Sequence, residues 1–185
     1  MMKKVSQFIL GFFGWKPYAL PEEPDKSIIC VAPHTSNWDF IIGKLFYWAL
    51  GRKTGFLMKK SWFFFPMGYL MRAMGGVPID RSKRTSVTQQ MIKEFDSRKK
   101  FHLAITPEGT RSMNNRWKLG FYHIAVGAGV PIQLAVIHYQ KKEMGIKEIF
   151  YPTGNEKEDL KYIYDFYRKN AGPKSDDKFA VPEIK

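Results

Sequence analysis

The sequence has little cysteine and no long apolar run, and each absence limits what the protein can be. Its one cysteine, Cys30, excludes an intrachain disulfide and fits a reducing compartment. Cys30 lies within an apolar segment, which favours a buried structural thiol over a nucleophile. No segment has the roughly 18–20 uninterrupted apolar residues that a membrane-spanning helix needs. The apolar start, residues 8–13, is short and lacks a small-residue cleavage site, so we expect it to be retained.

Acidic residues are also scarce. The 17 Asp and Glu residues stand against 30 Lys and Arg, so the 185 residues carry a formal net charge of +13, and 16% of them are aromatic. This charge predicts attraction to anionic partners, namely nucleic acid, anionic lipid headgroups or phosphorylated substrates. A basic aromatic nucleic-acid-binding module is one interpretation, but no recognised motif supports it, so we expect no nucleic-acid partner.

The first residues have the pattern of an amphipathic helix, which we expect over residues 3–16. Lysines lie mostly away from its apolar face, a composition typical of a helix in a membrane interface. The alternative is a helix packed on its own domain. We assign residues 1–20 to this helix and a linker. The apolar face comprises Val5, Phe8, Ile9, Phe12 and Phe13.

Beyond this segment, short apolar runs alternate with helical patterns. This alternation predicts a single α/β domain with a mixed, largely parallel sheet flanked by helices. The length allows one domain with a sizeable core, which we place at residues 21–170, followed by a C-terminal tail over residues 171–185. Strands are predicted at 27–32, 54–58, 77–79, 101–106, 131–139 and 148–151, and helices at 36–50, 86–99, 119–129 and 156–170. Residues 61–74 are expected to be helical in part, with a break near Pro66.

One stretch at a predicted strand end carries candidate chemistry. His34 follows the first predicted strand of this domain, and Asp39 stands five positions later in the first turn of the next helix. Ligands of open α/β sheets collect at the carboxyl ends of strands, and a carboxylate can fix the tautomer of a histidine base. However, Ser36 and Asp39 also have the spacing of a capping box. From these residues alone a helix cap and a base with its orienting carboxylate are equally good interpretations, and the two can coexist.

Two charged turns follow other predicted strands. Residues 106–112 present Glu108 and Arg111 together, and Arg81 follows residues 77–79. Arginine is suited to bidentate binding of a phosphate. The alternatives are an ordinary polar turn for the first segment and a surface ion pair for the second. The other three histidines lie within predicted strands or helices, where structural roles are favoured.

Together these segments resemble the glycerolipid acyltransferase family, the PlsC-type lysophosphatidate acyltransferases and their relatives. Four blocks occur in the family's order: His34 to Asp39 as His-x4-Asp, then residues 76–81, 107–111 and 130–132. The resemblance implies transfer of a fatty acyl group from an acyl thioester, either acyl-CoA or acyl-carrier protein, to a hydroxyl of a lysophospholipid-like acceptor. It implies neither a metal nor a cofactor besides this donor.

The resemblance also implies roles for single residues. His34 would be the general base on the acceptor hydroxyl, and Asp39 would orient it. The two arginines would bind an acceptor phosphate, and their neighbours would shape the acceptor site. The acceptor-binding residues would be Arg81, Glu108, Gly109, Thr110 and Arg111.

Departures from the family pattern leave the acceptor open. Pro33 and Thr35 flank the histidine where many lysophosphatidate enzymes have Asn and Gln, and Thr106 precedes Pro107 where Phe is common. A lyso-aminolipid such as lyso-ornithine lipid therefore fits as well as a lysophospholipid. We expect a peripheral or monotopic protein at the cytoplasmic face of the membrane, in contact with an anionic lipid surface.

Overall fold

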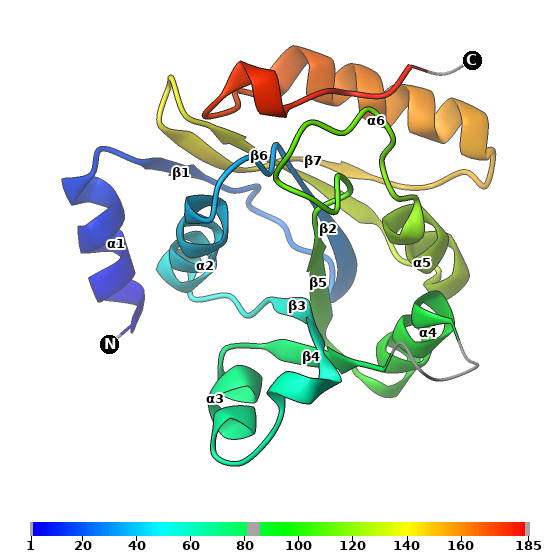
Figure 1. Cartoon of the computed structure of the whole chain (residues 1–185), viewed down its shortest axis with the longest axis horizontal. Helices are drawn as coiled ribbons and strands as arrows, with labels where there is room; N and C mark the ends of the chain where they lie inside the picture. Colours follow the sequence, from blue (N-terminus) through cyan, green and yellow to red (C-terminus); the bar gives the residue numbers. More distant parts are fainter. Residues whose placement is uncertain (1, 81–85, 184–185) are drawn as a thin grey trace.

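A seven-stranded sheet forms the centre of the computed structural model, which describes residues 2–80 and 86–183 (Figure 1). The strand order is β1-β7-β6-β2-β5-β3-β4, and the neighbouring strands are parallel except for the antiparallel pair β6 and β7. The structure thus confirms the predicted α/β domain with a mixed, largely parallel sheet. The strands are β1 (Lys16–Tyr18), β2 (Lys26–Ala32), β3 (Gly55–Lys59), β4 (Gly76–Ile79), β5 (Phe101–Ile105), β6 (Ile132–His138) and β7 (Glu143–Phe150).

Helices cover both faces of the sheet. Helices α1 and α2 lie on one face, whereas α4, α5 and α6 lie on the other, and α3 lies beside the edge strand β4 (Figure 1). The helices are α1 (Met2–Phe12), α2 (Trp38–Leu50), α3 (Met67–Ala73), α4 (Val87–Ser97), α5 (Gly120–Ala128) and α6 (Glu156–Asn170), with short 3-10 helices η1 (Lys60–Trp62) and η2 (Asp176–Lys178).

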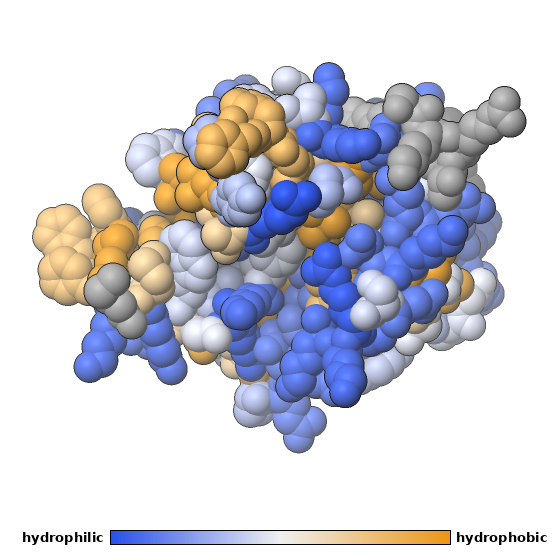
Figure 2. Space-filling view, turned by 90° about the horizontal axis from the view of Figure 1, so that it is seen from below, coloured by the Kyte–Doolittle hydropathy of each residue, from blue (hydrophilic) through white to orange (hydrophobic). Residues whose placement is uncertain are grey.

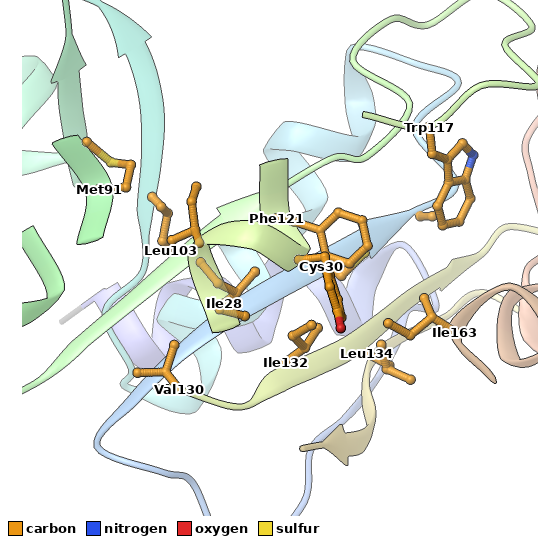
Figure 3. Close-up of a cluster of buried hydrophobic side chains, with 14 of the residues drawn as sticks. Ile28, Cys30, Met91, Leu103, Trp117, Phe121, Val130, Ile132, Leu134 and Ile163 are labelled. Atoms are coloured by element: carbon orange, nitrogen blue, oxygen red, sulfur yellow. The ribbon is translucent and has the colours of Figure 1, made fainter. Parts of the chain in front are cut away.

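The central strand β2 is apolar along its length because both of its faces are buried. Ile28 and Cys30 point to the cluster under α4, α5 and α6, whereas Ile29 points to the cluster under α1 and α2. Figure 3 shows the first cluster, in which Trp117 and Ile163 also take part. Burial raises the pKa of the Cys30 thiol to about 12, so this cysteine is a neutral packing residue at physiological pH.

The N-terminal helix is present, and it packs through a face adjacent to the predicted apolar one. Ser6 and Leu10 are buried against the domain, where α1 contacts α2. By contrast, Phe8 and Phe12 are 74% and 76% exposed. Packing on the domain and presentation of an apolar surface therefore coexist in this helix. None of the helices within the described residues is long and apolar enough to cross a bilayer.

Two strands differ from the sequence prediction. Strand β1 occupies part of the predicted linker, where Pro17 is tolerated because it lies on an edge strand of only three residues. Strand β7 begins at Glu143 rather than at Glu148, so it pairs with the whole of β6. Its first half interrupts the apolar residues with Glu143 and Gly145, which is not typical of a strand, and its pairing with β6 is interrupted by a β-bulge opposite Leu134 and Ala135.

Candidate active site

The candidate site lies where three neighbouring strands end. Strands β6, β2 and β5 are adjacent and parallel, so their carboxyl ends meet at one edge of the sheet. His34 follows β2, Glu108 follows β5 and Tyr139 follows β6. The topology thus gathers side chains that are about 30 to 100 positions apart in the sequence.

His34 and Asp39 lie side by side at this edge. His34 Nδ1 is 3.3 Å from Asp39 Oδ2, and the two side chains are 21% and 2% exposed. The same carboxylate oxygen accepts hydrogen bonds from the backbone N–H groups of Thr35 (2.7 Å) and Ser36 (2.8 Å). The backbone bonds fix the carboxylate, and the carboxylate in turn faces one nitrogen of the imidazole. The structure therefore has the geometry of a histidine with an orienting carboxylate.

The helix-cap interpretation also holds in part. Helix α2 begins at Trp38, whose N–H donates to Ser36 Oγ over 3.2 Å, and Asp39 caps the Ser36 N–H in return. Asn37 is the N-cap residue, and within the described chain its side chain makes no capping bond. Asp39 consequently serves the helix start and faces His34 at the same time.

Glu108 is the second acidic group of the site. Its side chain is only 1% exposed, and its Oε1 accepts a hydrogen bond of 2.7 Å from the backbone N–H of His34. Its Oε2 is buried without a hydrogen-bond partner among the described residues. Burial raises the pKa of Glu108 to about 7, against the opposing effect of the His34 N–H bond. Glu108 is thus a carboxyl group that changes charge near neutral pH beside the candidate base.

The turn that holds Glu108 is fixed by backbone contacts. Gly109 has φ +65°, and its N–H donates to Thr106 O. Asn114 donates to the carbonyl of Glu108 over 2.9 Å, and the N–H of Lys118 donates to Pro107 O over 2.7 Å. These bonds present Glu108 inward and leave the following residues of the turn in solvent.

The remaining predicted site residues divide into two groups. Thr110 and Arg111 are exposed on the turn that holds Glu108, so an anionic ligand can reach them from solvent. Arg81 lies outside the described residues, and its predicted role stays a prediction. Within residues 2–80 and 86–183, no three His, Cys, Asp or Glu side chains are grouped as metal ligands.

Tyr139 belongs to the site although the sequence did not single it out. Its hydroxyl donates a hydrogen bond to Asp39 Oδ1, the carboxylate oxygen that faces away from His34. The signal that could have found it is its position at the end of the predicted strand 131–139, by the same argument that selected His34. What the sequence lacks is the strand order that places β6 beside β2.

A histidine–carboxylate pair at the carboxyl edge of an α/β sheet has the arrangement of a site for a ligand bound at that edge. The chain belongs to the acyltransferase family, since a family model described as Acyltransferase matches residues 18–138. The resemblance drawn from the four sequence blocks is thereby confirmed.

Two relatives illustrate this membership. The chain is 33% identical over 110 residues to the 1-acyl-sn-glycerol-3-phosphate acyltransferase of Escherichia coli (strain K12), across 56% of this chain and 44% of that protein. It therefore spans less than half the length of that relative. Its fold is similar to the crystal structure of the 1-acyl-sn-glycerophosphate (LPA) acyltransferase PlsC from Thermotoga maritima, with a TM-score of 0.61 and 19% identity over 91% of this chain and 76% of that one.

Proposed function

We propose that the protein is an O-acyltransferase that moves a fatty acyl group from an acyl thioester to a hydroxyl of a lysophospholipid-like acceptor. The observation that carries this proposal is the placement of His34 against Asp39 and Glu108 at the carboxyl edge of an acyltransferase-family sheet. The Escherichia coli relative supports this acceptor class, because its name specifies 1-acyl-sn-glycerol-3-phosphate. The donor class, acyl-CoA or acyl-carrier protein, follows from the family resemblance.

The chemistry follows from the two nitrogens of His34. With its Nδ1 facing the Asp39 carboxylate, the imidazole carries its proton there, and Nε2 is left as the basic nitrogen. Nε2 removes the proton of the acceptor hydroxyl while the hydroxyl oxygen attacks the thioester carbonyl carbon. The new C–O bond forms, the C–S bond breaks, and the proton on His34 passes to the departing thiolate. Asp39 stabilises the imidazolium between these two proton transfers.

The acceptor-binding residues of the proposal lie on the turn after β5. Arg111 is exposed and suits a phosphate that arrives from a lipid surface, with Gly109 and Thr110 beside it. Glu108 is buried and accepts the His34 N–H, so in this proposal it shapes the acceptor site by holding the His34 backbone. Arg81 completes this set as a prediction from the sequence.

Two exposed apolar patches support a lipid surface as the partner. Figure 2 shows both on one face of the molecule, one at the left over α1 and one over the η1–α3 segment. Exposed lysines adjoin them, including Lys3, Lys4, Lys59 and Lys60, so the surface matches anionic headgroups. The α1 patch comprises Val5, Phe8, Phe12 and Phe13, and the α3 patch comprises Trp62, Phe64, Phe65, Tyr69 and Leu70.

The experiment is an acyl-transfer assay with purified protein. Labelled palmitoyl-CoA and palmitoyl-acyl-carrier protein are each offered with lysophosphatidate, other lysophospholipids and lyso-ornithine lipid, and the products are identified by mass spectrometry. His34→Ala should lower kcat by at least ~10²-fold because it removes the base. His123→Ala, on the exposed surface of α5, is the matched control and should leave kcat unchanged.

Each outcome of this assay decides a separate point. Full activity of a folded His34→Ala protein would contradict the assigned base. Turnover of lyso-ornithine lipid in preference to lysophosphatidate would replace the acceptor and keep the reaction. Absence of transfer to every acceptor from both donors would overturn the proposed function.

A further inference from the structure

Tyr139 completes the contacts of the Asp39 carboxylate. Oδ2 of Asp39 is held by two backbone N–H groups and faces His34, whereas Oδ1 accepts its hydrogen bond from the Tyr139 hydroxyl. Burial, with the adjacent Asp39 carboxylate as a further cause, raises the pKa of Tyr139, so the hydroxyl remains a donor. A carboxylate engaged at both oxygens cannot rotate away from the imidazole without losing a charge-assisted hydrogen bond.

The Tyr139 ring is itself held in place. Its backbone N–H donates to Gly172 O over 2.8 Å, and its carbonyl accepts from the N–H of Lys142 over 3.1 Å. Trp15 packs against the ring edge to face, with centroids 5.3 Å apart and planes at 82°. Lys174 lies over the same ring, with Nζ 6.0 Å from its centroid. The hydroxyl is therefore aimed at Asp39 by contacts on several sides.

Trp15 connects this ring to helix α1. The Trp15 N–H donates to the carbonyl of Leu10 in the last turn of α1, over 2.8 Å. Lys142, in the turn that begins with Tyr139, accepts from the N–H of Lys16 and donates from Nζ to Phe13 O. The end of α1 and the β6–β7 turn are thus tied together by backbone and ring contacts.

We propose that Tyr139 is a positioning residue for the His34–Asp39 pair, and that Trp15 couples the seating of α1 to that pair. The kinetic part of this inference rests on the proposed acyl transfer, whereas the geometric part concerns the ligand-free protein. The Tyr139 hydroxyl keeps the Asp39 carboxylate facing Nδ1 of His34. The contact with Trp15 keeps the Tyr139 ring, and so its hydroxyl, directed at Asp39. A movement of α1 on a lipid surface would therefore change the position of the His34 imidazole relative to Asp39.

The test compares Tyr139→Phe with the wild-type protein in two measurements. The substitution removes the hydroxyl and keeps the ring, so the Trp15 contact survives. We expect kcat for palmitoyl-CoA and lysophosphatidate to fall about tenfold or more, as for loss of a hydrogen bond to a charged group, with an unchanged KM for the acceptor. In the ligand-free protein, the ¹⁵N chemical shifts of the His34 ring should move towards a mixture of tautomers. Tyr151→Phe, an exposed tyrosine outside the site, is the matched control and should change neither readout.

The Trp15 step has its own pair of variants. Trp15→Phe retains an aromatic edge and should behave as wild type, whereas Trp15→Ala should shift the His34 ring signals in the same direction and lower kcat about threefold. Unaltered His34 signals and kcat in folded Tyr139→Phe would overturn the positioning role. Unaltered values in Trp15→Ala alone would overturn the coupling to α1.

The two readouts separate this inference from the proposed function. A wild-type protein that transfers no acyl group but shows the expected change of His34 signals in Tyr139→Phe would refute the acyltransferase activity and retain the positioning role. If the wild-type protein transfers acyl groups, and Tyr139→Phe changes neither this activity nor the His34 ring signals, the acyltransferase activity is retained and the positioning role of Tyr139 is refuted.

Discussion

Glu108 shows how one buried residue can make a protein sensitive to pH. Its carboxyl group is removed from solvent, and only one of its oxygens has a hydrogen-bond partner among the described residues. Both features favour the neutral form, while the His34 N–H favours the charged one. The balance places its titration near pH 7, where the charge beside the candidate base changes.

Substitution of Glu108 by Gln should therefore alter the pH dependence of stability. The pKa rises from 4.5 to about 7 on folding, so the stabilising contribution of the protonated form is complete below pH 4.5 and is lost as the pH rises through about 7. As the pH rises from below 4.5 to above about 7, the ionisation of Glu108 should lower the unfolding free energy of the wild-type protein by about 3 kcal/mol. Glu108→Gln should not show this loss, which urea denaturation at a series of pH values measures. Glu183→Gln, at an exposed residue, is the control. A difference between Glu108→Gln and wild type that is constant across the series would contradict the assignment.

At the scale of single elements, β1 illustrates what sequence patterns cannot reveal. Its three residues are exposed and include Pro17, so composition indicates a linker. The strand exists because β7 offers a free edge, and Tyr18 pairs with Gly145 there. Gly145 has φ +153°, and a Cβ at this position would lie 1.7 Å from the carbonyl oxygen of Tyr18. The close approach of the two backbones thus requires glycine on β7.

Gly145→Ala should displace β1 and destabilise the protein. The added methyl group cannot be accommodated by a side-chain movement, since the atom that it meets belongs to the backbone. We expect a loss of about 2 kcal/mol in unfolding free energy, measured by urea denaturation. Gly43→Ala in α2 is the matched control: outside the adjacent backbone of its own helix, its Cβ would meet no described atom within 4 Å, and the helix should gain about 0.5–1 kcal/mol. Equal changes of the unfolding free energy in the two variants would contradict the assigned contact between β1 and Gly145.

Part of the site could be predicted from sequence because it depends on local order. His34 and Glu108 each follow a strand that the apolar runs identify, and Asp39 stands in the first turn of α2. Tyr139 could not be selected, since its contact with Asp39 spans 100 positions and depends on β6 lying beside β2. Similarly, the spacing in α1 identifies its apolar face but does not say which face contacts the domain.

At the scale of the whole molecule, charge and apolar surface act together. The net charge of +13 attracts the protein to any anionic surface, over a range that the ionic strength limits. The α1 and α3 patches supply the short-range contact, because their aromatic residues are exposed to water in the free protein. Two separate patches on one face also restrict how the molecule can be oriented on a surface (Figure 2).

Both patches should be needed for tight binding to anionic vesicles. We expect Phe8→Ser with Phe12→Ser, and separately Phe64→Ser with Phe65→Ser, to weaken partitioning onto phosphatidylglycerol-containing vesicles at least tenfold each, at about 1.5–3 kcal/mol per buried Phe. Vesicle co-sedimentation measures this, and added salt should weaken wild-type binding through the charge term. Tyr151→Ser, 68% exposed and outside both patches, should bind as wild type does. If the α1 variant loses binding but the α3 variant keeps it, the molecule attaches at one point, and its orientation on the surface is not fixed by the α3 patch.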